Sequence, residues 1–183
     1  MNLLDVIIET ERLYLKAISR DFADDIFREF TPEITKYMYP KPKENIEETY
    51  EYIEKTLSKI KEGDELEMVI TKKENNEFIG VCGIYDLNKL GPGLWIWIKK
   101  SSHNNGFGLE AINGLIEWSN INIKFDYLEY PVDKRNIASR RIPEKNNGKI
   151  VKEEKSEGEA GNELDEYIYI GYIQNNKSKT NYT

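Results

Sequence analysis

Apolar residues recur every three or four positions in four segments of this chain, which is the spacing of one face of a helix. The pattern predicts helices over residues 21–30, 46–62, 109–119 and 137–145. Asn45 and Glu48 form a capping box before the second of these segments, and Gly63 is expected to end it. The chain therefore contains about four amphipathic helices.

Shorter apolar or alternating runs, bounded by turn residues, predict strands between these helices. The expected strands cover residues 8–18, 66–72, 77–87, 94–98, 127–132, 149–153 and 166–172. The order of elements favours a mixed sheet of the α/β or α+β class and not a doubly wound one. We expect one domain over residues 1–173, a hairpin loop over 153–162 and a disordered polar tail over 174–183.

Composition narrows the class of protein further. Of the 183 residues, 39% are hydrophobic and 32% charged, as in a globular protein, and no apolar run is long enough to span a bilayer. The net charge of −7 argues against a nucleic-acid partner. A single cysteine, a single histidine and a start without a secretion signal predict a cytoplasmic protein without a metal site.

The segment from Leu94 to Ala111 carries the main functional signal. An apolar strand is followed by a loop containing Asn104, Asn105 and two glycines, and these residues tolerate positive φ. Such a loop can direct several backbone N–H groups to one point at the positive end of the following helix. The pattern predicts a phosphate-binding cradle. The alternative is an ordinary strand–helix connection without a ligand.

The run from His103 to Gly108 resembles the cofactor signature of the GNAT superfamily of acetyl-CoA-dependent N-acetyltransferases. Both glycine positions match, whereas His103 stands where the family usually has Gln or Arg. Two further blocks, over residues 9–15 and 136–145, resemble the branch related to ribosomal-protein N-terminal acetyltransferases. The resemblance therefore covers nearly the whole chain.

This resemblance implies a sheet of about seven strands whose fourth and fifth strands splay apart to admit the pantetheine arm of acetyl-CoA. It implies that the diphosphate binds the amides from Asn104 to Gly108. The cofactor-binding residues that it implies are Ile96, Ile98, His103, Asn104, Asn105, Gly106, Phe107, Gly108, Asn136 and Ser139. Ser139 would also be catalytic by returning a proton to the leaving thiolate. Without a cofactor, Asn136 is a helix cap and Ser139 an ordinary first-turn residue.

The expected reaction is direct attack of a primary amine, from a peptide N-terminus or a small molecule, on the thioester. The base is not assigned, because Gly91-Pro92-Gly93 stands where many relatives carry Glu. Glu67, Tyr85 and Asp86 are candidates, and a water relay is the alternative. Tyr37, Tyr39 and Trp95 are candidates for the acceptor side. The alternative hypothesis is a catalytically silent CoA-binding or sensor domain. The chain is expected to be a monomer or homodimer.

Overall fold

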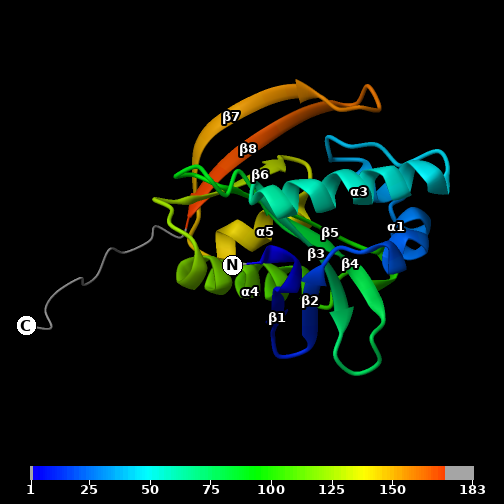
Figure 1. Ribbon diagram of the computed structural model, residues 1–183. Helices are drawn as coiled ribbons and strands as arrows, with labels where there is room; N and C mark the ends of the chain where they lie inside the picture. The colour runs from blue at the N-terminus through cyan, green and yellow to red at the C-terminus, as the bar shows by residue number, and fades with distance from the viewer. Residues whose placement is uncertain (1, 172–183) are drawn as a thin grey trace, which may run out of the picture.

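The computed structural model describes residues 2–171, and its centre is an eight-stranded sheet (Figure 1). The strand order is β1-β2-β3-β4-β5-β6-β8-β7. All neighbouring strands are antiparallel except β5 and β6, which are parallel. The strands are β1 (Ile7–Glu9), β2 (Leu13–Ala17), β3 (Glu65–Lys72), β4 (Phe78–Tyr85), β5 (Gly93–Ile98), β6 (Leu128–Asp133), β7 (Lys149–Glu157) and β8 (Glu163–Gly171).

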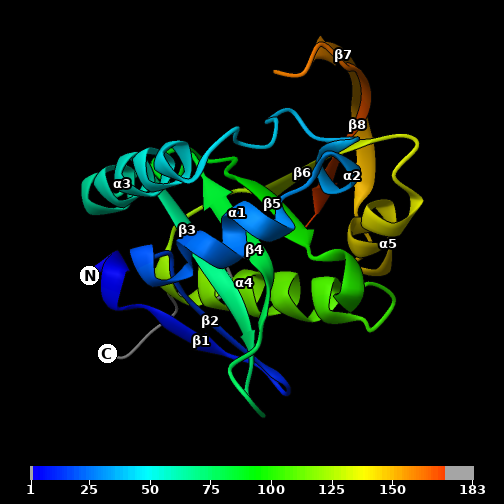
Figure 2. The same cartoon turned by 90° about the vertical axis from the view of Figure 1, so that its right-hand side faces the viewer.

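Helices cover both faces of this sheet (Figures 1 and 2). One face carries α1 (Ala23–Glu29) and α3 (Ile46–Glu62), and the other carries α4 (Phe107–Asn122) and α5 (Ile137–Lys145). A one-turn helix, α2 (Pro32–Thr35), follows α1. Because both faces are covered, β3 and β4 are buried along nearly their whole length. Mixed α/β layering in a single domain, as predicted, is confirmed.

The two faces have separate apolar cores. Leu13, Met68 and Ile112 belong to the core between the sheet and α4, and none of them is exposed to solvent. Ile53, Val69 and Trp97 belong to the core beneath α1 and α3. The cores are separated only by the sheet, so a gap between two strands connects one face with the other.

That gap lies between β5 and β6. The two strands are in register only at Gly93 and Glu129, where Glu129 N–H donates to Pro92 O at 2.9 Å. Beyond this pair the strands diverge, whereas β4 pairs with β5 along the whole of β5. The predicted splay of the two central strands is therefore confirmed.

Some boundaries differ from the sequence prediction. The first strand is a hairpin, β1 and β2, because Thr10 turns the chain and accepts N–H of Leu13 on its Oγ1, which brings the strand count to eight. The last two strands are longer than expected, so their loop shrinks to residues 158–162. Helix α4 begins two residues early, at Phe107. The predicted tail, residues 174–183, lies outside the described residues.

Candidate functional site

A cleft of about 1110 Å³ occupies the gap between β5 and β6 and reaches both faces of the sheet. Its lining combines the start of α4, the exposed edge of β5, the first turns of α5, and the aromatic segment that follows α1. Among the described residues, it contains nearly every functional candidate that the sequence singled out. The predicted residues that line it are Tyr37, Tyr39, Glu67, Tyr85, Trp95, Ile96, Ile98, His103, Asn104, Gly106, Phe107, Gly108, Asn136 and Ser139.

The loop before α4 is shaped by two residues with left-handed backbones. Asn104 has φ 62° and Gly106, the N-cap residue of α4, has φ 78°. Within residues 2–171, no protein acceptor is found for the backbone N–H groups of residues 104–108. These donors lie at the positive end of a 16-residue helix, where an anion is stabilised. The arrangement forms an open cradle of donors, which can hold an anion such as a phosphate group.

The cradle is fastened to the N-terminal hairpin by Glu110. One carboxylate oxygen of Glu110 accepts Thr10 Oγ1–H at 2.6 Å and Arg12 N–H at 2.7 Å, and the other accepts Arg12 Nε–H at 2.7 Å. Arg12 also donates to Asn105 O at 3.1 Å. Burial acts to raise the pKa of Glu110, but these hydrogen bonds outweigh it and hold the pKa below its usual value. No pattern along the chain signals this connection, because the partners lie about a hundred positions apart.

Gly108 forms the floor of the cradle. A methyl group at this position would meet Ile142 Cδ1 at 3.4 Å and Ile98 Cγ1 at 3.7 Å, so the helix packs closely on β5 here. Lys99 N–H donates to Ile79 O on β4 at 2.8 Å. Since alternate residues of a strand point to opposite neighbours, the backbone groups of Ile96 and Ile98 face the gap. A ligand lying in the gap can pair with this free strand edge.

Three of the predicted cofactor residues have structural partners of their own. His103 is exposed beside the cleft, with its Nε2 2.7 Å from Ile98 O. Asn105 is not among the cleft-lining residues, since its side chain folds back to donate to Ser102 O and His103 O. Phe107 is buried in the core, and the Arg12 guanidinium lies 4.6 Å from its ring centroid. Asn105 and Phe107 thus shape the loop through their side chains.

The start of α5 brings a hydroxyl pair to the opposite wall. Asn136 caps the helix by accepting Ser139 N–H on its Oδ1 at 3.2 Å. Ser139 Oγ lies 2.9 Å from the Tyr130 hydroxyl on β6. Burial raises the pKa of Tyr130 well above its usual value, so this hydroxyl stays protonated. Tyr130 was not predicted, because an aromatic residue on a strand gives no sign beyond burial.

The structure separates the three candidate bases. Glu67 is 5% exposed, lines the cleft and accepts a short hydrogen bond from the Tyr52 hydroxyl on α3. Tyr85 lines the cleft, and burial raises its pKa to about 12. Asp86 does not line the cleft and pairs with Lys89 at 2.8 Å. Burial raises the pKa of Glu67 to about 8, which leaves it the best placed to exchange a proton near neutral pH.

Two loops that border the cleft contact each other at one of its ends. The tip of the β7–β8 hairpin meets the segment after α2, where Glu159 N–H donates to Tyr39 O at 2.8 Å. Asn162 Nδ2 donates to Met38 O at 3.3 Å, and Lys41 N–H donates to the Glu159 carboxylate at 3.1 Å. Tyr37, Tyr39 and Trp95 line the cleft, and their assignment to the acceptor side stays a prediction.

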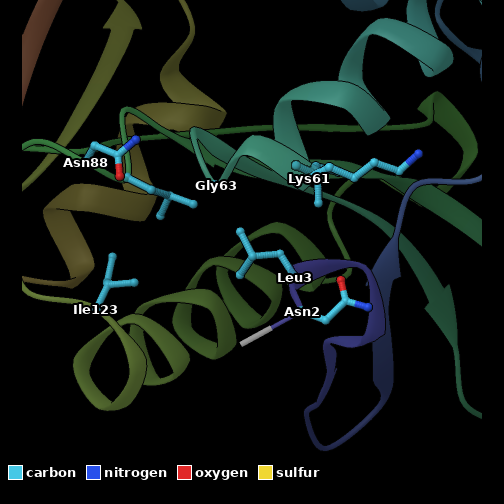
Figure 3. Close-up of a pocket in the computed structure, with 8 residues that line it drawn as sticks. Asn2, Leu3, Lys61, Gly63, Asn88 and Ile123 are labelled. Carbon is cyan, nitrogen blue, oxygen red and sulfur yellow. The ribbon is translucent and has the colours of Figure 1, made fainter.

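A second hollow, of about 270 Å³, lies between the N-terminal turn and the end of α3 (Figure 3). Two of its polar side chains are engaged locally: Asn2 Oδ1 accepts Leu4 N–H, and Asn88 donates to Asp64 at 2.7 Å. Leu3 and Ile123 supply its apolar walls (Figure 3). No catalytic group converges on this hollow within the described residues.

No helix among residues 2–171 is both long enough and apolar enough to cross a membrane.

Residues 12–149 match the family model described as the acetyltransferase (GNAT) domain. A curated relative, the uncharacterized N-acetyltransferase p20 of Bacillus licheniformis, is 26% identical over 136 residues, which cover 73% of this chain and 76% of that protein.

Solved structures share the fold at low sequence identity. A putative ribosomal-protein-serine acetyltransferase from Vibrio cholerae superposes with a TM-score of 0.78 at 17% identity, over 91% of this chain and 97% of that one. RimL, a ribosomal L7/L12 alpha-N-protein acetyltransferase in complex with coenzyme A, gives 0.76 at 16% identity, over 92% and 99%. The microcin C7 self-immunity acetyltransferase MccE, in complex with acetyl-CoA and AMP, gives 0.79 at 18% identity, over 89% and 93%.

Proposed function

Because this chain belongs to the GNAT acetyltransferase family and is an acyltransferase that uses acetyl-CoA, we propose that it transfers the acetyl group to a primary amine. The acceptor is the N-terminus of a peptide or a small-molecule amine. The observation that carries this proposal is the cleft itself, which joins the phosphate cradle of α4 to the buried carboxyl group of Glu67.

The residues present fit acetyl-CoA as the co-substrate. The free backbone N–H groups of residues 104–108 would hold the diphosphate, and Gly106 would let it approach without a side chain in the way. On the edge of β5 that faces the gap, the backbone groups of Ile96 and the N–H of Ile98 would pair with the amides of the pantetheine arm, whereas Ile98 O has His103 Nε2 at 2.7 Å. Asn136 lies on the opposite wall, at the start of α5.

The thioester supplies an activated acetyl carbon, and the chain supplies position and proton transfer. Ser139 Oγ–H would donate a proton to the leaving sulfur, and the Tyr130 hydroxyl would support Ser139 by donating to its oxygen. The amine nitrogen must lose a proton as it bonds to carbon. Holding both reactants in one cleft removes several kcal/mol of the barrier.

The proposal is tested by incubating the protein with acetyl-CoA and a panel of peptides and small amines, with free thiol as the readout. We expect thiol release that depends on the amine and a product heavier by one acetyl group. Acetyl-CoA binding without thiol release, with amines of every class in the panel, would overturn the transfer and leave a CoA-binding protein without this activity.

Ser139→Ala is expected to lower kcat by roughly tenfold, with little change in the KM for acetyl-CoA. The effect is at the low end of the range for acid catalysis because a thiolate is already a good leaving group. Steady-state kinetics with the best amine of the panel measure this. Ser139→Thr keeps the hydroxyl and is the matched control. Equal losses in both variants would contradict a role for the hydroxyl.

A further inference from the structure

Glu67 is the one described carboxyl group of the cleft that is almost fully buried, at 5% exposure. A carboxylate without a cation beside it is costly to bury, and no ion pair of Glu67 is found within residues 2–171. Its partner is a neutral hydroxyl, that of Tyr52, which points from α3 onto β3. A buried carboxyl group of this kind lowers the stability of the fold, and residues that do so are expected at functional sites.

The register of the sheet places Glu67 beside the proposed reaction centre. Glu67 on β3 lies opposite Gly83 on β4, which lies opposite Trp95 on β5. Strands are spaced by about 4.8 Å, so this row spans about 10 Å from β3 to β5. Trp95 is two residues beyond Gly93, where β5 leaves β6 and the gap for the pantetheine arm begins.

The absence of a side chain at Gly83 leaves room for the indole of Trp95. A methyl group there would be 2.6 Å from Trp95 Nε1, so the indole lies directly over this glycine. Opposite residues in neighbouring strands project to the same face, and Trp95 packs on the α3 side. The carboxyl group of Glu67 and the indole of Trp95 are therefore on one face of the sheet, at the level where the gap opens.

A buried polar atom of α3 that lines the same cleft lacks a hydrogen-bond partner among the described residues. Thr49 lines the cleft with no exposed surface, and its Oγ1 has no hydrogen-bond partner in the described structure. Thr49 and Tyr52 are three residues apart on α3 and so share a face. Leaving a buried hydroxyl unpaired costs about 1–3 kcal/mol, which a bound polar ligand would recover. The acceptor amine, brought between α3 and the sheet, is such a ligand.

We propose that Glu67, oriented by Tyr52, is the catalytic base of the amine acetylation proposed above, on which this inference rests. As the nitrogen bonds to the thioester carbon and the C–S bond breaks, the nitrogen loses a proton to the Glu67 carboxylate. Ser139 gives a proton to the departing sulfur and recovers one from solvent, and Glu67 returns its proton to solvent. The products are an amide and free CoA.

The environment sets the proton affinity of this group. Burial raises the pKa of Glu67 to about 8, the nearby Glu65 on β3 raises it further, and Tyr52 and Lys59 on α3 act to lower it. Cys82 on β4, buried and with its own pKa raised by burial, stays a neutral thiol. Since a base works when ionised, kcat/KM is expected to rise with pH through the pKa of Glu67.

Glu67→Gln is the first test, because glutamine keeps the size and can still accept the Tyr52 hydroxyl. We expect kcat to fall about 100-fold at pH 8, with acetyl-CoA binding retained. Glu65→Gln is the matched control: Glu65 lies two residues away, lines the same cleft and pairs with Lys59 at 3.2 Å, so its kcat is expected to change less than threefold. Equal effects of the two changes would overturn the proposal.

The Tyr52→Phe variant tests whether Glu67 acts as a base or has only a structural role. Because the Tyr52 hydroxyl lowers the pKa of Glu67, its removal is expected to move the rise of kcat/KM to higher pH, with activity recovered there. An infrared titration of the protein without acetyl-CoA should show a carboxyl band that ionises near pH 8 and is absent in Glu67→Gln. If the wild type turns over and the pH profile is unchanged in Glu67→Gln and in Tyr52→Phe, the role of Glu67 as the base is overturned, but the acetyl transfer is not. If the wild type does not turn over, both the transfer and this inference are overturned.

Discussion

Gly106→Val is expected to weaken acetyl-CoA binding by at least about 100-fold in a protein that still folds. A branched side chain disfavours φ 78°, so the loop before α4 would move to a negative φ and turn its N–H groups away from one another. Losing two hydrogen bonds to a charged phosphate costs about 3 kcal/mol or more. At 1.4 kcal/mol per tenfold, this accounts for the loss. Calorimetric titration with acetyl-CoA measures it.

Gly108→Ala is the matched control for this change. Its methyl group would meet Ile142 and Ile98 at 3.4 and 3.7 Å, which are ordinary contacts, and Gly108 does not have a positive φ. We expect binding within about threefold of the wild type. If Gly106→Val binds acetyl-CoA as well as Gly108→Ala does, then the left-handed turn does not organise the cradle.

Asp133→Asn is expected to lower the free energy of unfolding by about 3 kcal/mol at pH 7. The Asp133 side chain is fully buried at the end of β6, and it accepts Arg135 Nε–H at 2.8 Å and Arg135 Nη2–H at 2.7 Å. It also accepts the backbone N–H groups of Arg135 and Asp165. An amide turns a donor toward these donors and leaves some of them unpaired in a buried place. Urea unfolding measures the loss.

The stabilisation by Asp133 is expected to depend on pH in one direction. Burial acts to raise the pKa of Asp133, but the hydrogen bonds from Arg135 and Asp165 outweigh it and hold the pKa below its usual value. The stabilisation is therefore complete above the unfolded pKa of about 3.9 and is lost as pH falls through the lower, folded pKa. The difference between wild type and variant should shrink in that acid range.

Glu153→Gln is the control for Asp133→Asn. Glu153 also carries a paired carboxylate, 2.6 Å from Lys134, but its side chain is 62% exposed. Exposed pairs contribute about 0–1 kcal/mol, so the unfolding free energy should hardly change. An equal loss in both variants would contradict the assignment of the lost stability to the burial and hydrogen bonding of Asp133.

The local parts of the site were predictable because short-range chemistry fixes them. The loop from Asn104 to Gly108 contains residues that tolerate positive φ, and the structure uses Asn104 and Gly106 in that way. Asn45 and Asn136 cap their helices as their positions suggest. Such features depend on a few neighbouring residues, so the sequence carries them directly.

The parts that could not be predicted depend on contacts between distant segments. Glu110 fastens α4 to Arg12, and Asn162 closes the cleft against Met38, but neither pair has a pattern along the chain. Glu67 stood among three candidate bases until the fold buried it against Tyr52 and left Asp86 outside the cleft. The prediction of one early strand was wrong because Thr10 gives no strong turn signal.

Hydrogen exchange of the backbone amides, with and without acetyl-CoA, tests the placement of the co-substrate most directly. We expect protection concentrated on residues 104–108 and on the edge of β5 at Ile96 and Ile98. We expect no change around the smaller hollow at Leu3 and Ile123. Binding of acetyl-CoA without protection of the loop before α4, or protection centred elsewhere, would contradict the placement of the co-substrate in the gap between β5 and β6.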